Sequence, residues 1–69
     1  MQVVRMEITG MSCGHCVAAV SRALEAVDGV SNARVELGAA TVSYDGDRAN
    51  VRQLEQVVAD EGYVVVATH

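Results

Sequence analysis

The chain has 69 residues, of which 51% are hydrophobic, but Val and Ala dominate that set, and there is no Phe or Trp and only two Tyr. A chain of this length barely supports one apolar core, so residues 1–69 are predicted to form one small domain. Five scattered Arg and no Lys stand against nine acidic residues, a net charge of −4, which argues against a nucleic-acid surface, since that needs clustered basic residues and stacking aromatics.

The first part of the chain predicts a strand followed by a helix. The run VVRMEI at 3–8 alternates apolar and polar residues, which is the period of a half-buried strand. From Gly14 the apolar spacing changes to three and four residues, as on one face of a helix, in Val17, Val20, Leu24 and Val27. The pair Asp28-Gly29 is expected to end this helix, because Gly commonly follows a helix end.

The middle of the chain predicts a β-hairpin. Residues 30–37 place Val30, Ala33, Val35 and Leu37 near a two-residue period, and residues 40–44 form a second alternating run. The predicted turn between them passes through Gly38-Ala39.

The last part predicts a second helix and a last strand. Asn50 and Gln53 have the spacing of a capping box, and the apolar stripe that follows consists of Val51, Leu54 and Val58. Glu61-Gly62 is expected to close this helix. The run YVVVAT at 63–68 is rich in β-branched residues and is predicted to be a strand.

The predicted element order is βαββαβ. This is the split βαβ, ferredoxin-like α+β arrangement, a four-stranded antiparallel sheet with two helices on one face. The fold is common and does not by itself indicate a function. RNA-binding domains share it, but the exposed aromatics that would stack on bases are missing here.

The chain's two cysteines lie in one short stretch, GMSCGHC at residues 10–16. Cys13 is predicted to lie in the loop after the first strand, and Cys16 in the first helical turn, where the helix N-terminus favours thiolate. The pair could pack as small hydrophobes, form a redox-active disulfide or bind a soft metal. Gly, Ser and His are poor core neighbours. Thiol oxidoreductases usually carry a flanking aromatic and a proline, both missing here, so metal binding is favoured and enzyme activity is not expected.

The number of ligands favours a soft ion of low coordination number. A closed zinc site needs four ligands, and the chain offers two Cys, His15 and His69. Two thiolates match the softness of Cu(I). Ag(I), Hg(II) and Zn(II) remain open as alternative ions.

The stretch GMSCGHC resembles the Gly-Met-x-Cys-x-x-Cys signature of the heavy-metal-associated domain family. This family includes small copper chaperones and the N-terminal domains of copper-transporting P-type ATPases. The resemblance covers essentially the whole chain, with DGV after the first helix and EGY after the second placed as in the family. It implies a Cu(I) site at Cys13 and Cys16 and transfer of the ion to a similar domain by thiolate exchange.

Three further residues belong to this candidate site. The resemblance implies that Met11 packs under the loop. His15, between the two cysteines, is expected to be an exposed spacer; the alternatives are weak ligation of a copper ion shared by two molecules and a pH-dependent effect on the thiolates. Tyr63 matches a loop position near the metal where many bacterial relatives have Tyr and eukaryotic chaperones have Lys. His69 is expected to be a solvated terminus.

Location and partners are expectations at this point. No stretch is long enough to span a membrane and the N-terminus lacks an export signal, so a cytoplasmic chain without membrane insertion is expected. The resemblance implies a monomer, or a copper-bridged dimer, whose partner is the metal-binding domain of a copper-transporting P-type ATPase or a copper-responsive repressor. An excised transporter domain and a thiol-disulfide redox module remain alternatives.

Overall fold

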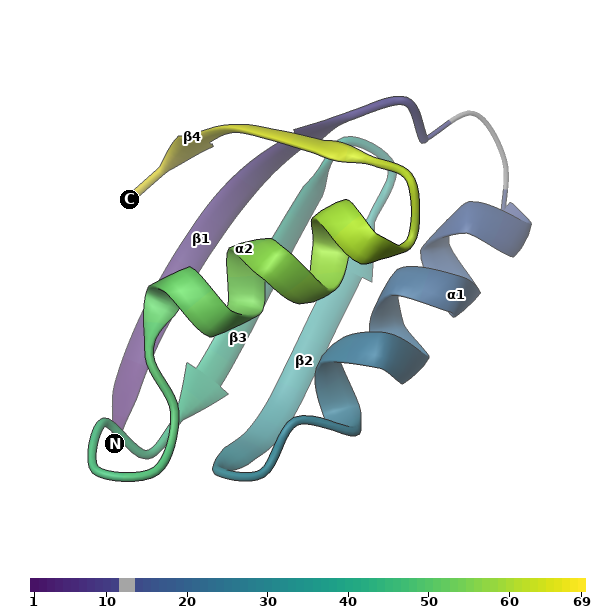
Figure 1. Cartoon of the computed structure of the whole chain (residues 1–69). Coiled ribbons are helices and arrows are strands. Elements are labelled where there is room, and N and C mark those ends of the chain that lie inside the picture. The colour runs from purple at the N-terminus through teal and green to yellow at the C-terminus, as the bar shows by residue number, and fades with distance from the viewer. Residues whose placement is uncertain (12–13) are drawn as a thin grey trace.

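The structure, a computed structural model, describes residues 1–11 and 14–69. The elements in these ranges are β1 (Gln2–Thr9), α1 (Gly14–Glu25), β2 (Val30–Glu36), β3 (Ala39–Tyr44), α2 (Val51–Asp60) and β4 (Val64–Thr68). These strands form one antiparallel sheet in the order β2-β3-β1-β4, and both helices lie on the same face of it (Figure 1). The predicted ferredoxin-like architecture is confirmed.

The core lies between the sheet and the two helices. Along β1, side chains alternate between this core and the open face, and those at most 4% exposed are Val4, Met6 and Ile8. The helices contribute side chains with no exposed surface, which are Val20, Leu24, Leu54 and Val58. Burying a side chain of this size stabilises the fold by roughly 1.5–3 kcal/mol, so the aliphatic core holds both helices on the sheet.

The start of α2 is fixed by the predicted capping box. The Asn50 side chain accepts a hydrogen bond of 2.9 Å from the Gln53 backbone N–H, and the Gln53 side chain accepts one of 3.0 Å from the Asn50 N–H. Each bond satisfies a backbone donor that the first helical turn leaves without a partner.

The hairpin turn differs from the prediction by one residue. Glu36 pairs with Ala39, so the turn is Leu37-Gly38 rather than Gly38-Ala39. Gly38 has φ +83°, a conformation that Gly adopts at little cost and Leu does not. Leu37 therefore lies in the turn rather than in strand β2. Its side chain is 59% exposed, whereas the alternating pattern predicted that it belongs to the apolar face of the strand.

Helix α1 ends earlier than the apolar spacing predicts. Its last residue is Glu25, and the Val27 N–H bonds to the Leu24 carbonyl oxygen in the tighter turn that follows. Val27 is thus outside the helix, but it still packs against the core. The apolar spacing continues past the end of α1 because the turn keeps the Val27 side chain on the core-facing side of the helix.

Candidate metal centre

The candidate site lies where β1 leads into α1. Gly10 follows β1 with φ +94°, and α1 begins at Gly14. The prediction that Cys13 lies in the intervening loop falls outside the described residues. Cys16 lies in the first turn of α1, where the sequence placed it, and is half-buried.

The electrostatics of the helix start favour an anionic sulfur. Gly14 and His15 are exposed, so this turn of α1 faces solvent. The turn carries no acidic residue. No carboxylate of that turn therefore offsets the partial positive charge of the helix N-terminus, which favours the thiolate form of a cysteine placed there. Cys16 thus lies in a position suited to a soft, anionic ligand near the surface.

Met11 is half-buried and packs against the hydrophobic core. This contact fits a packing role under the loop. A thioether is a flexible, polarisable group that fills irregular spaces between core side chains. Met11 therefore anchors the start of the loop.

Tyr63 lies beside Gly10, at the start of the loop. It is half-buried against the core, and a Cβ built on Gly10 would lie 3.4 Å from its Cδ1 atom. Nearby, the Thr9 hydroxyl donates a hydrogen bond of 3.4 Å to the Val64 carbonyl oxygen. The start of β4 is therefore held against the end of β1 next to the candidate site.

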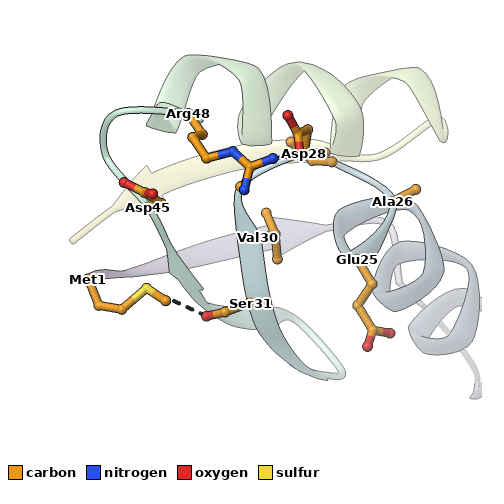
Figure 2. A pocket seen from close by; sticks show the side chains of 10 residues that line it. Met1, Glu25, Ala26, Asp28, Val30, Ser31, Asp45 and Arg48 are labelled. Atoms are coloured by element: carbon orange, nitrogen blue, oxygen red, sulfur yellow. Dashed lines mark hydrogen bonds and ion pairs between the residues drawn. The ribbon is translucent and has the colours of Figure 1, made fainter.

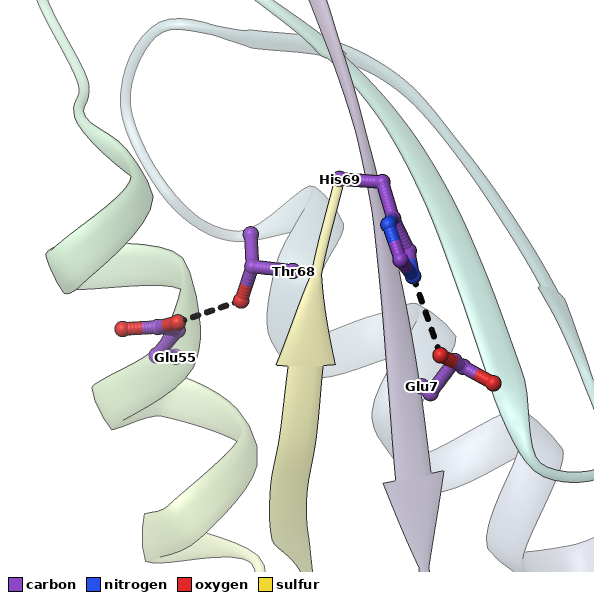
Figure 3. Close-up of polar contacts among 4 residues, drawn as sticks. All are labelled: Glu7, Glu55, Thr68 and His69. Carbon is purple, nitrogen blue, oxygen red and sulfur yellow. Dashed lines mark hydrogen bonds and ion pairs between the residues drawn. The ribbon is translucent and has the colours of Figure 1, made fainter.

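The two histidines occupy different environments. His15 is exposed on the first turn of α1, the environment expected for a spacer. His69 is exposed, as expected for a solvated terminus, and in addition its ring Nε2 lies 3.0 Å from a Glu7 carboxylate oxygen on β1 (Figure 3). Since β4 runs away from Tyr63 to His69, the structure does not bring His69 to Cys16.

Within residues 1–11 and 14–69, no three His, Cys, Asp or Glu side chains gather as a metal cluster. A hollow of about 460 Å³ lies at the far end of the molecule, and Figure 2 shows Arg48 there between Asp28 and Asp45. Arg48 donates a hydrogen bond to Asp28, which raises the pKa of Arg48 above its usual value. The polar groups that line this hollow are mostly hard oxygens and a guanidinium, and its one sulfur is the Met1 thioether, which accepts a hydrogen bond from Ser31; the hollow offers no pair of thiolates for a soft ion.

The comparison with known families decides the classification. The sequence profile of the heavy-metal-associated domain matches residues 5–63, which is most of the chain. The chain belongs to this family. A curated relative of this heavy-metal-associated domain is the copper chaperone CopZ of Staphylococcus aureus, 44% identical over 63 residues that cover 88% of this chain and 93% of the relative.

Solved structures agree with this classification. A CopZ metallochaperone superposes with a TM-score of 0.92 at 42% identity, covering 94% of this chain and 100% of that one. The N-terminal domain of a potential copper-translocating P-type ATPase from Bacillus subtilis, solved in the Cu(I)-loaded state, gives a TM-score of 0.86 at 31% identity over 91% of this chain and 81% of that one.

No helix in the described residues is long and apolar enough to cross a membrane.

Proposed function

We propose that this heavy-metal-associated domain is a copper chaperone that binds Cu(I) through the thiolates of Cys13 and Cys16. The observation that carries the proposal is the position of Cys16 in the solvent-facing first turn of α1, within the GMSCGHC motif. The near full-length similarity to a copper chaperone supports the same function.

Cu(I) is the proposed form of copper because both ligands are soft. Thiolates prefer soft monovalent ions, and two of them satisfy an ion of low coordination number. The similarity to a domain solved in its Cu(I)-loaded state supports this choice. His15 is exposed on the same turn and is proposed to be a spacer that does not bind the ion.

The proposed acceptor is a similar domain of a copper-transporting P-type ATPase. The likeness to such a domain, solved in the Cu(I)-loaded state, supports an acceptor with the same fold as the donor. A copper-responsive repressor is the second proposed acceptor. The cytoplasmic location remains a prediction, and so does the oligomeric state, a monomer or a copper-bridged dimer.

Transfer is proposed to proceed by ligand exchange. Cys16 is held by the first turn of α1, which continues into the buried side chains Val20 and Leu24. Cys13 is therefore proposed to be the thiolate that leaves first. An acceptor thiolate adds to the copper ion before the Cu–S bond to Cys13 breaks, so the ion keeps two or three sulfur ligands throughout. Faster transfer from Cys13→Ser than from Cys16→Ser would contradict these roles.

A thiol-disulfide redox module is the competing function. It would use the same two cysteines, but the chain contains no proline and no tryptophan. In an insulin-reduction assay with a thiol donor, we expect no turnover above the uncatalysed rate. Turnover comparable to that of a thioredoxin would favour the redox function.

The binding proposal is tested by competition with a chromophoric Cu(I) chelator under anaerobic conditions. We expect one Cu(I) per chain, withdrawn from the chelator, with binding weakened in Cys13→Ser and in Cys16→Ser and lost in the double variant. His15→Ala is the matched control and should bind as the parent does. Tight binding retained by the double cysteine variant would refute the proposed site, and preferential binding of Hg(II) or Zn(II) in parallel titrations would refute the choice of metal.

A further inference from the structure

Strand β4 forms one edge of the sheet and carries no charged side chain. Among the described strands it pairs only with β1. Its sequence is VVVAT, and Val64 and Val66 are 59% and 60% exposed. Edge strands offer unpaired backbone groups, and proteins commonly protect them with charged side chains. The opposite edge, β2, has this protection from exposed Arg34 and Glu36, whereas β4 lacks it.

The edge is held in a fixed position at its C-terminal end (Figure 3). The Thr68 hydroxyl donates a hydrogen bond of 2.6 Å to a Glu55 carboxylate oxygen on α2, and the His69 ring contacts Glu7 on β1. The backbones of His69 and Arg5 exchange two hydrogen bonds of 2.8 and 3.1 Å. An edge that is already ordered loses little conformational entropy when another strand pairs with it.

A groove of about 390 Å³ runs between this edge and α2. One wall consists of Arg52, Glu55, Gln56 and Ala59, and the other of residues 63–65. A strand added beside β4 would therefore lie next to α2 and place its own helix-facing side chains near this groove. The groove gives the edge a second contact surface beyond the backbone hydrogen bonds.

The exposed row of α2 beside the groove has an ordered charge pattern. Arg52, Gln56 and Asp60 are four residues apart and lie on one face of the helix, and all three are exposed. A short turn joins α2 to β4, so Asp60 lies near the start of β4 and Arg52 near its end. The Glu55–Thr68 hydrogen bond fixes this alignment. Gln56 is the middle residue of this row, and Val66 is the middle residue of β4, where the register with β1 shifts from Glu7–Ala67 to Ile8–Val65.

This pattern is complementary to a second copy of itself. In a twofold arrangement with antiparallel β4 strands, the two α2 helices also run antiparallel. Arg52 of each copy then faces Asp60 of the other, and the neutral Gln56 faces its own equivalent. Opposite charges meet at both ends, which favours this orientation over one with parallel strands, where Arg would face Arg.

We propose that the β4 edges of two copies pair in this antiparallel way, around a twofold axis near Val66 and Gln56. The sheet then continues from one molecule into the next. Gly10, where each cysteine loop begins, lies beside Tyr63 just before β4, so the two loop starts lie at opposite ends of the interface. The dimer forms without metal and is distinct from a copper-bridged dimer.

The test is sedimentation velocity of the metal-free full chain over a range of concentrations, with reductant and a copper chelator present. We expect a monomer–dimer equilibrium. Val66→Lys places two like charges together at the axis and should weaken dimerisation about tenfold or more. Val3→Lys is the matched control, since Val3 is 65% exposed but lies on the inner strand β1; it should leave dimerisation unchanged.

A charge exchange tests the orientation independently. Arg52→Asp should weaken the dimer, and the double variant with Arg52→Asp and Asp60→Arg should recover most of the loss, because the opposite charges still meet. A chain that stays monomeric at every concentration would overturn the proposal. A dimer that Val66→Lys leaves intact would also overturn it, and so would association that appears only after Cu(I) is added. Either result would show that the two copies meet through a surface other than the β4 edge.

Discussion

Gly10, just after β1, lies beside the ring of Tyr63, just before β4: a Cβ built on Gly10 would be 3.4 Å from that ring, an ordinary van der Waals distance. Gly10 has φ +94°, and this backbone conformation favours Gly at the position. The end of the last helix–strand turn therefore lies next to the start of the loop that leads to the proposed copper ligands.

Gly10→Ala is therefore expected to destabilise the fold by about 1–2 kcal/mol, because an L side chain is strained at this φ. The same change should weaken Cu(I) binding, since the start of the loop shifts. Urea unfolding and chelator competition measure the two effects. Gly14→Ala is the matched control, because a Cβ there meets no atom within 4 Å and Gly14 is the first residue of α1. It should be neutral or stabilise the helix; equal losses in both variants would contradict the role given to Gly10.

Leu24 connects the cysteine-bearing helix to the core. Its side chain is 0% exposed. Leu24→Ala should lower the free energy of unfolding by about 2–5 kcal/mol, as expected when a cavity forms in a packed core. The free energy of unfolding of so small a domain is only a few kcal/mol, so the variant should unfold at a much lower urea concentration than the parent. A loss below about 1 kcal/mol would show that neighbouring side chains fill the cavity left by Leu24, which would contradict the tight packing described here.

Cu(I) should stabilise the folded chain, because the start of α1 orders the proposed thiolate pair, whereas the unfolded chain must order it on binding. At a free Cu(I) concentration one thousand times the Kd, the expected gain is up to about 4 kcal/mol, reduced by any binding of Cu(I) to the unfolded chain. Thermal unfolding under anaerobic conditions, with copper held by a buffer, measures the gain. The double variant with Cys13→Ser and Cys16→Ser serves as the control. A midpoint that does not move at saturating copper would argue against binding to the native state.

The capping box of α2 lies away from the cysteine loop and should affect stability alone. Asn50→Ala removes the acceptor for the Gln53 N–H and should cost about 1 kcal/mol. Cu(I) affinity should stay that of the parent. If chelator competition instead showed weaker binding, α2 would be coupled to the site in a way that these contacts do not explain.

Much of the fold follows from local patterns in the sequence. The alternation in β1 and the spacing from Gly14 onward predict the right elements because each has one buried face. The asparagine at position 50 marks the start of α2 through a hydrogen bond that needs only nearby residues. Leu37 was predicted wrongly because the exact turn position depends on which residue takes the positive φ, and that residue is Gly38.

The candidate site was less accessible to sequence reasoning alone. The motif places Cys16 in the first turn of α1, but the proximity of Gly10 to Tyr63 joins opposite ends of the chain. Only the family resemblance brought Tyr63 to the site. The pairing of His69 with Glu7 was missed, because it depends on the register between β4 and β1, which no local pattern reports.

The most direct test of the copper chaperone proposal is stopped-flow transfer of Cu(I) from this chain to an acceptor metal-binding domain at increasing acceptor concentrations. Ligand exchange through Cys13 predicts a rate that rises with acceptor concentration and exceeds the spontaneous release of Cu(I) into a chelator. A rate that stays flat with acceptor concentration and equals the spontaneous release rate would contradict the account.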